Sequence, residues 1–284
     1  MKTLVLANQK GGVGKSAIGC QFSYFLAQAG LRVLNLDLDH QMNSSRPLAM
    51  SGRAGVAGFS SMAVLEGRPG PLPDCGFVSI PGDDLLSTLE RQPDRHNSFV
   101  NTLDKFLGSL GDRFDVCVID TNPNPDIRYA AALITADFLL SPIELNQEAI
   151  DGIGALLNHS RYGYRKIKKV LNPKLDLIGI LPNLVEATPF QKGNFEQLVV
   201  AFSQLLIPLK AGPANRFAFI PARTAIAEAQ AAGVPLWLLR QAVPLATVGV
   251  VAANSMPIRT SAREAWREIK PAFDTIAHRM GLGV

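Results

Sequence analysis

The segment Lys10–Ser16 (KGGVGKS) has the residue types and spacing of a site that binds phosphate groups. It follows a short apolar run, Thr3–Ala7, and it precedes apolar positions at helical spacing between Lys15 and Ala29. Closely spaced glycines between a strand and a helix let successive backbone N–H groups turn toward an anion, and the helix N-terminus adds its positive end. Lys15 can neutralise phosphate oxygens, and Ser16 can offer its hydroxyl to Mg²⁺. The segment therefore predicts a nucleotide phosphate site.

Acidic side chains follow two further predicted strands. Leu31–Asp37 leads into Asp39, and Phe114–Asp120 is a nearly continuous apolar run that ends in an acid, as is typical of a strand buried on both faces of a parallel sheet. Transfer of a phosphoryl group to water needs positive charge, a metal ion and an aligned water. We expect Lys10 and Lys15 to supply the charge, Ser16 and Asp120 to hold the metal ion, and Asp39 to position the water.

The carboxylates after the second strand have alternative roles. Asp39 also fits a residue of the Mg²⁺ shell or an acid that caps a helix. Asp37 fits an acid at the end of a strand that supports the following loop.

The elements that must position these residues alternate between strand and helix over most of the chain. Further strands are predicted at Phe138–Ile143, Leu175–Leu181 and Phe217–Ile220, and helices at Asn194–Leu206, with Asn194 as its N-cap, and at 261–280. Ser261 and Glu264 form a capping-box pattern, and Pro271 is expected to kink or divide the last helix. The pattern predicts an α/β fold with a mostly parallel sheet and helices on both faces, in one domain over 1–284 with a candidate loop-rich insertion at 52–95.

Composition excludes several classes of protein. The chain has 284 residues, of which 47% are hydrophobic and 18% charged, and this balance does not fit disordered, collagen-like or coiled-coil proteins. Cys20, Cys75 and Cys117 are too far apart in sequence for a disulfide framework or a paired-cysteine metal site. The first apolar stretch is too short for a signal peptide, and the longest uncharged apolar run, Ala242–Ala253, is too short to span a bilayer. We therefore expect no transmembrane segment and a cytoplasmic location.

The net charge of +4 is unevenly distributed along the chain. Residues 1–150 hold 12 basic and 16 acidic side chains, whereas residues 151–284 hold 16 and 8. Two basic sets stand out in the second half, one of Arg161, Arg165 and Lys168 and the other of Arg259, Arg263, Arg267 and Lys270. Such stripes suit contacts with the phosphates of a nucleic acid, although basic residues on helices are also common on solvated faces.

The glycine-rich segment resembles the deviant P-loop of the ParA/MinD ATPases, which carries an early lysine, here Lys10, directly before the paired glycines. Three more stretches are similar to that family. Asp37–Asn43 (DLDHQMN) resembles its D-x-D-P-Q-G-N segment, Phe114–Asp120 resembles its Walker B strand, and Ile220-Pro221 resembles the start of its segment on the C-terminal side of the nucleotide site. Within the family, the chain looks closest to plasmid and chromosome partition proteins of the ParA type.

The resemblance implies an ATPase on a P-loop fold that uses ATP and Mg²⁺. In that family Lys10 would reach the phosphates of the partner in an ATP-bound homodimer, Asp39 would orient the attacking water, and Asp120 would hold Mg²⁺ through water. The nucleotide would be contacted by Lys10, Gly11, Gly12, Val13, Gly14, Lys15, Ser16, Ala17, Asn183 and Pro221. The dimer would bind DNA non-specifically on the nucleoid, and a ParB-type centromere-binding protein would stimulate hydrolysis and release it.

The sequence departs from the family pattern at several positions. His40 replaces a proline, Met42 replaces a glycine, and Asn122 lies where a Pro-Pro or Ala-Pro pair is usual. A family arginine that contacts DNA falls on Ala225, and Arg223 is the expected substitute. Asn183 alternatively is a turn residue after Pro182. Two other functions remain open: a MinD-like ATPase anchored to a membrane surface by Trp266, Phe273 and Ile276, and a small-molecule ligase or iron–sulfur reductase on the same scaffold.

Overall fold

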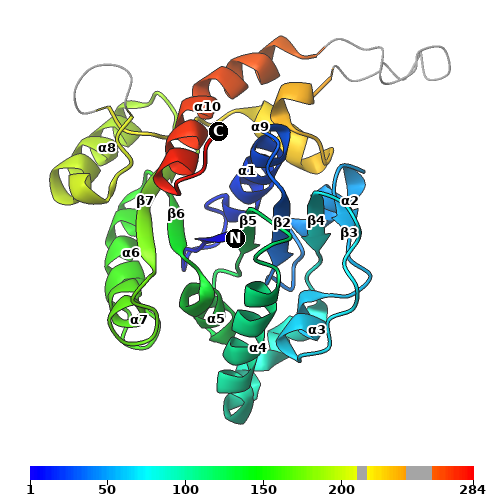
Figure 1. Cartoon of the computed structure of the whole chain (residues 1–284). Helices are drawn as coiled ribbons and strands as arrows, with labels where there is room; N and C mark the ends of the chain where they lie inside the picture. Colours follow the sequence, from blue (N-terminus) through cyan, green and yellow to red (C-terminus); the bar gives the residue numbers. More distant parts are fainter. Residues whose placement is uncertain (210–215, 241–257) are drawn as a thin grey trace, which may run out of the picture.

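The structure, a computed structural model, describes residues 1–209, 216–240 and 258–284 (Figure 1). The apolar run Ala242–Ala253 therefore lies outside the described residues. The strands are β1 (Lys2–Leu6), β2 (Val33–Asp37), β3 (Gly55–Val56), β4 (Phe77–Ile80), β5 (Val116–Asp120), β6 (Phe138–Glu144) and β7 (Asp176–Asn183). The α-helices are α1 (Lys15–Gln28), α2 (Ser45–Met50), α3 (Ser61–Leu65), α4 (His96–Ser109), α5 (Ile127–Thr135), α6 (Gln147–Asn158), α7 (Tyr164–Val170), α8 (Pro189–Phe202), α9 (Thr224–Ala231) and α10 (Thr260–Arg279).

All named strands of the described chain join one parallel sheet in the order β3-β4-β2-β5-β1-β6-β7. The expected α/β fold with a parallel sheet is confirmed. The strands predicted at Thr3–Ala7, Leu31–Asp37, Phe114–Asp120, Phe138–Ile143 and Leu175–Leu181 are present with small shifts of their ends. Because β2 and β5 pair with Asp37 opposite Asp120, the two acidic strand ends lie side by side.

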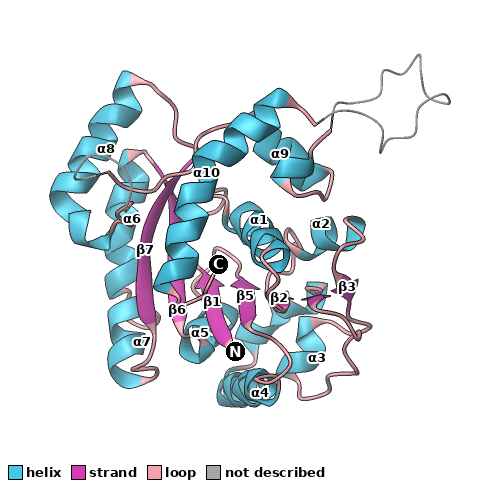
Figure 2. Ribbon diagram, turned by 45° about the horizontal axis from the view of Figure 1, so that its top comes forward, coloured by secondary structure: helices cyan, strands magenta, loops and turns pink. Residues whose placement is uncertain are grey.

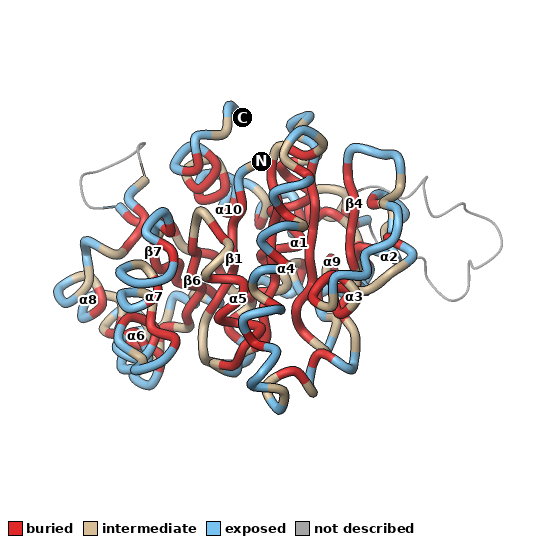
Figure 3. The backbone as a smooth tube through the Cα atoms, turned by 60° about the horizontal axis from the view of Figure 1, so that its bottom comes forward, coloured by how far each residue is buried: buried red, intermediate tan, exposed pale blue. Residues whose placement is uncertain are grey.

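Helices cover both faces of the sheet because its strands send alternate apolar side chains to opposite sides. In β5, Val116 and Val118 pack with α1 and α10, whereas Cys117 and Ile119 pack with α4 and α5. Figure 2 shows α1 and α10 on one side of the strands and α4 and α5 on the other. The central strands are buried, and the exposed residues lie mainly on the outer helices (Figure 3).

Several expected element boundaries were wrong. Phe217–Ile220 is not a strand, because only isolated bridges pair Phe217 with Pro208 and Pro221 with Val185. Helix α8 begins at Pro189 with Thr188 as its N-cap, so Asn194 is a buried residue within the helix that donates a hydrogen bond to the Leu145 carbonyl. The segment 52–95, expected to be rich in loops, supplies β3 and β4 to the sheet.

The last helix runs from Thr260 through Pro271 without a break, so the expected division at this proline does not occur. Its N-cap is Arg259, which makes no capping hydrogen bond through its side chain, so the capping box at Ser261 is also absent. The apolar side of α10 packs on α1, where the rings of Phe273 and Phe22 meet edge to face at 5.2 Å between centroids. No helix in the described ranges is both long enough and apolar enough to cross a bilayer.

Candidate functional site

The predicted phosphate loop lies between β1 and α1, at the carboxyl ends of the parallel strands, where ligands of open α/β sheets bind. Gly12 and Gly14 have φ angles of 78° and 87°, and Gly14 is the N-cap of α1. Left-handed backbone at these positions favours glycine, and it turns the loop so that backbone N–H groups and the start of α1 face a common point. The backbone at Gly12 and Gly14 thus has the conformation that the predicted phosphate loop requires.

Contacts from neighbouring strands hold the loop in place. The Asn8 side chain accepts a hydrogen bond from the Lys10 amide at 2.8 Å and donates one to the Pro142 carbonyl at 2.9 Å. Asn183, the last residue of β7, donates from Nδ2 to the Val13 carbonyl at 2.8 Å, and its side chain fills the space beside Gly14. Asn183 is therefore a strand residue that braces the loop, and its interpretation as a turn residue after Pro182 was wrong.

Lys15 is buried at the bottom of the loop, and its Nζ donates to the Lys10 carbonyl oxygen at 3.1 Å. Burial lowers the pKa of Lys15, and the negative charges of Asp120 and Asp39 oppose that shift. Lys15, which is predicted to neutralise phosphate, therefore lies close to Asp120, expected to hold the metal ion, and to Asp39, expected to position the water. The structure brings together Lys15, Asp39 and Asp120.

Asp120 is fully buried at the end of β5, and neither of its carboxylate oxygens makes a hydrogen bond of good geometry within the described chain. Burial, followed by the charge of Asp37, raises the pKa of Asp120 to about 8, while the nearby Ser16 hydroxyl and Lys15 oppose the rise. A buried carboxylate without a partner is costly unless a cation or a proton compensates it. Asp120 and Ser16 offer oxygen ligands of the type that Mg²⁺ prefers, so these residues fit a magnesium ion.

The two acids after β2 have different surroundings. Asp37 is buried and accepts hydrogen bonds from the Asp39 amide and from both the amide and the hydroxyl of Ser45, at 2.8 to 3.0 Å. Asp37 therefore supports the loop after β2, as expected of an acid at the end of this strand. Asp39 is almost buried, and its Oδ1 accepts from the Gln41 amide at 3.0 Å within a turn closed by the Met42 amide. Its charge acts on Lys15 and Asp120, as expected of an acid beside the phosphate site.

Lys10 takes up a position that sequence reasoning missed. Its Nζ lies 3.3 Å from Oδ1 of Asn146 and 3.2 Å from Oε2 of Glu148, both at the start of α6. Asn146 is the N-cap of that helix, a role that its position before an apolar-periodic segment could have indicated. The pairing of Lys10 with Glu148 spans 138 residues and has no local sequence signal.

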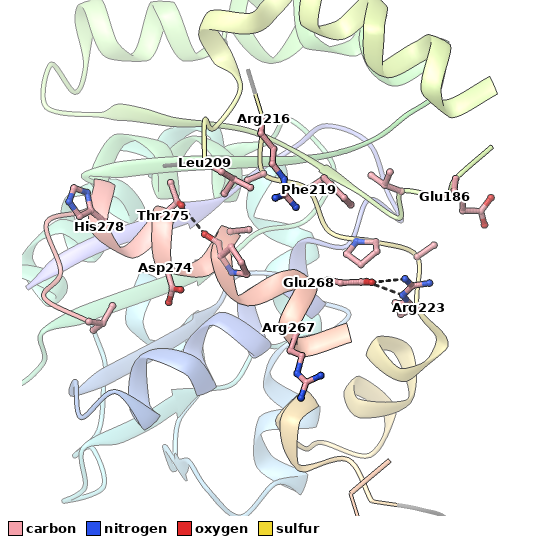
Figure 4. A pocket seen from close by; sticks show the side chains of 18 residues that line it. Glu186, Leu209, Arg216, Phe219, Arg223, Arg267, Glu268, Asp274, Thr275 and His278 are labelled. Atoms are coloured by element: carbon pink, nitrogen blue, oxygen red, sulfur yellow. Dashed lines mark hydrogen bonds and ion pairs between the residues drawn. The ribbon is translucent and has the colours of Figure 1, made fainter. Parts of the chain in front are cut away.

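Pro221 lies beside the residues that follow β7, because it bridges to Val185. It also lines a cavity of about 1020 Å³ between α10 and the segments 185–187 and 216–223, drawn in Figure 4. No residue of the phosphate loop lines that cavity.

The two basic sets lie on opposite faces of the sheet, because α7 packs with α4 and α5 whereas α10 packs with α1. Arg161 precedes α7 instead of sharing its helical face, and it pairs with Glu90, while Lys168 pairs with Asp176. Arg165 donates to the Asn158 side chain at 2.9 Å. The three residues of the α7 set therefore have partners within the chain.

The α10 set is partly paired as well. Arg259 pairs with Glu228, and Lys270 pairs with Asp274. Arg223 donates from Nη2 and Nε to Glu268 at 2.8 and 3.1 Å, as the dashed lines in Figure 4 show. Arg263 and Arg267 are exposed, and no ion pair or hydrogen bond of their side chains is found within the described ranges. Arg267 and Arg263 are thus the members of this set that are open to a phosphate ligand.

Structural features weigh against two of the alternative functions. Phe273 and Ile276, expected as membrane anchors, are buried against the core, and Trp266 packs against the ring of Phe25. Cys20 and Cys117 are buried in α1 and β5, and Cys75 is exposed elsewhere, so the cysteines do not form the surface pair that an iron–sulfur reductase needs.

Comparisons with known proteins identify the family of the chain. The family model described as the CobQ/CobB/MinD/ParA nucleotide binding domain matches residues 4–236. Protein IncC of Escherichia coli is 31% identical over 99% of this chain and 70% of its own length. The chromosome-partitioning ATPase Soj of Thermus thermophilus is 28% identical over 66% of this chain and 70% of its own length. Among solved structures, cobyrinic acid a,c-diamide synthase from Mycobacterium smegmatis with bound ADP and magnesium is 26% identical, with a TM-score of 0.64 over 81% of this chain and 89% of that one.

Proposed function

Because the chain belongs to the CobQ/CobB/MinD/ParA nucleotide-binding family, we propose that it is a DNA-partition ATPase of the ParA type. In this proposal, binding of ATP and Mg²⁺ forms a homodimer, the dimer binds DNA non-specifically on the nucleoid in the cytoplasm, and hydrolysis stimulated by a ParB-type protein releases it. The proposal rests on the cluster of Lys15, Asp39 and Asp120 beside the glycine-rich loop. Lys10 of the same loop lies nearer the surface and pairs with the exposed Glu148. Relatives that include a chromosome-partitioning ATPase support the biological role.

The chain's own residues perform most of the chemistry. The loop amides and Lys15 bind and neutralise the phosphates of ATP, and the buried position of Lys15 strengthens this attraction by excluding water. Asp120 and Ser16 hold Mg²⁺, which when bound supplies further positive charge to the phosphate oxygens. Asp39 aligns the water for attack on the terminal phosphate. Asn183 keeps the loop in the shape that fits phosphate.

The position of Lys10 supports the proposed dimerisation. In the single chain its ammonium group pairs with Glu148, whose side chain is 85% exposed, so the lysine lies at the surface beside the phosphate loop. On ATP binding, Lys10 leaves Glu148 and contacts the phosphates bound by the second copy. An exposed ion pair contributes only about 0.2 to 1 kcal/mol, so this exchange has a small energetic cost.

Contact with DNA is assigned to the α10 set. Arg263 and Arg267 are exposed on the side of α10 that faces away from the core, with Ile269 buried on the other side. Arginine side chains that have no partner among the described residues can bind phosphates without losing an ion pair seen there. DNA binding of this kind is independent of base sequence and decreases with salt.

A direct test compares DNA with a membrane surface as the ATP-dependent ligand. The protein is sedimented with non-specific duplex DNA or with phosphatidylglycerol vesicles, in ATP or in ADP. The proposal predicts that ATP increases sedimentation with DNA and leaves sedimentation with vesicles at the level of the protein alone. ATP-dependent sedimentation with vesicles but not with DNA would overturn the proposal in favour of a MinD-like ATPase.

A small-molecule ligase is the second candidate, because the cobyrinic acid a,c-diamide synthase shares 26% identity with this chain. A ligase couples ATP turnover to a carboxylic acid and an amine. Its ATP turnover would therefore need those substrates and would not respond to DNA. Measurement of ATP turnover with DNA, and separately with cobyrinic acid and ammonium, distinguishes the two functions.

A further inference from the structure

Arg128, at the start of α5, is an arginine with only 4% of its surface exposed. A buried charge of this kind needs a partner, because the guanidinium group loses its hydration on burial. The partner is Asp126, which accepts from Nε of Arg128 at 3.0 and 3.2 Å and also from Nη2. The side chains of Arg128 and Asp126 thus form a buried ion pair directly after the loop that follows β5.

The Asp126 carboxylate is itself fixed by the local backbone. It is the N-cap of α5 and accepts from the Arg128 amide at 2.9 Å, and its Oδ2 accepts from the Asn122 side chain at 2.9 Å. Because the carboxylate is held by the helix end and by the preceding loop, the guanidinium group that it binds is held as well. The guanidinium group of Arg128 therefore has a fixed orientation. Its third nitrogen, Nη1, does not bind Asp126 and can contact another residue.

The contact of this nitrogen is with the loop that follows β2. Nη1 of Arg128 lies 3.1 Å from Nδ1 of His40, a contact between residues 88 positions apart. A guanidinium group only donates, so Nδ1 of His40 accepts in this contact. The same Nδ1 lies 3.2 Å from Oδ1 of Asp39. Because Nδ1 accepts from Arg128, this approach is not a hydrogen bond, and Arg128 acts on Asp39 by fixing its chain neighbour His40.

We propose that Arg128 is a positioning residue for ATP hydrolysis, which acts through His40 to hold the turn that carries Asp39. This inference rests on the proposed function, in which Asp39 aligns the attacking water. Strands β2 and β5 are neighbours, so the loops after them lie at one edge of the sheet, and the contact between His40 and Arg128 ties these two loops together. A carboxylate that aligns water must be held closely, since small displacements cost large factors in rate.

Variants of His40 test the proposal without breaking the buried ion pair of Arg128 and Asp126. His40→Ala removes the contact, and we expect kcat for ATP to fall at least about tenfold. We expect the Kd for a non-hydrolysable ATP analogue and the thermal midpoint to stay near those of the unchanged protein. His40→Asn supplies an acceptor at this position again, as an amide oxygen in place of the ring nitrogen, and should recover most of the lost rate.

Arg128→Lys provides the second test, because lysine keeps the charge but has no fork that can bind Asp126 and His40 together. It should lower kcat as His40→Ala does, and the double variant should be no slower than the slower single one. Arg95→Lys is the matched control, since Arg95 pairs with Glu66 away from the site, and it should keep the full rate.

The outcomes separate this inference from the proposed function. If the unchanged protein hydrolyses ATP and both His40→Ala and Arg128→Lys keep its kcat, the positioning role is wrong and the proposed function stands. If both variants lose analogue binding in proportion to rate, the contact is structural and the inference is also wrong. If the unchanged protein hydrolyses no ATP with DNA present, the proposed function fails, and the inference fails with it.

Discussion

The side chain of Asn183 donates a hydrogen bond to the carbonyl oxygen of Val13 at 2.8 Å, which joins the end of β7 to the phosphate loop. The residues lie 170 positions apart, and the amide group occupies the space directly beside Gly14. The shape of the loop therefore depends on a residue from a distant strand as well as on its own glycines.

Gly14→Ala should abolish nucleotide binding, because the new Cβ would overlap Nδ2 of Asn183 and the backbone has a φ of 87°. Gly12→Ala is the matched comparison. It has a similar φ of 78°, but its nearest neighbour is 4.0 Å away, so it meets only the conformational cost of about 1 to 2 kcal/mol. Titration with a fluorescent ATP analogue should give a much larger loss of affinity for Gly14→Ala, and equal losses would contradict the packing argument.

Asp120 should make the nucleotide-free protein less stable as pH rises. Its pKa is about 8 in the folded chain against about 3.9 in an unfolded one. Between these values the unfolded chain has released its proton and the folded chain has kept it, so rising pH favours unfolding. Asp120→Asn removes this titration. Urea unfolding at several pH values should show the variant gaining stability relative to the unchanged protein from about pH 4 to about pH 8, and a constant difference would refute the burial argument.

Glu148→Gln should promote dimerisation with a non-hydrolysable ATP analogue, because it removes the charge that holds Lys10 in the single chain. Each of the two subunits releases one such pair, and two exposed pairs of up to about 1 kcal/mol each correspond to at most about a thirtyfold lower dimer Kd. Asp151→Asn, on the same helix but paired with Gln147, is the control and should leave the dimer Kd unchanged. Sedimentation velocity measures both, and a weaker dimer for Glu148→Gln would show that Glu148 supports the active arrangement instead.

Met42 has a φ of 56°, which places its backbone in the left-handed region that residues other than glycine disfavour. The ParA/MinD pattern has glycine at this position. Met42→Gly and Met42→Ala both remove the side chain, but only glycine removes the conformational cost. After the greater freedom of glycine in the unfolded chain is included, we expect Met42→Gly to be about 0.5 to 1 kcal/mol more stable than Met42→Ala. Unfolding midpoints in urea compare the two, and an alanine variant of equal or greater stability would contradict the prediction.

The central sheet and the phosphate loop could be predicted because their signals are local. Apolar runs such as Phe114–Asp120 end at glycine, proline or acidic residues, and the loop contains its own glycines. By contrast, β4 lies in a segment rich in glycine and proline, where four apolar or small residues give little periodicity. The start of α8 has a local signal in Thr188 before Pro189, a typical N-cap and first helical residue, but the apolar pattern after Asn194 is stronger and indicates a later start.

Side-chain pairing could not be predicted, because the partners are far apart in sequence. Glu268 on α10 binds Arg223, 45 residues away, and this removes one of the arginines expected to be open to DNA. In the sequence His40 is distinguished only by replacing a family proline, because its contact with Arg128 depends on the pairing of β2 with β5 in the sheet.

Retention on DNA with and without a working phosphate loop tests the account most directly. The unchanged protein and Lys15→Gln are passed over immobilised non-specific duplex DNA in ATP and Mg²⁺ and again in ADP and Mg²⁺, with folding of the variant checked by circular dichroism. We predict that only the unchanged protein in ATP is retained, and that added salt releases it. Equal retention in ADP, or undiminished retention of Lys15→Gln in ATP, would contradict the claim that nucleotide binding at this loop controls binding to DNA.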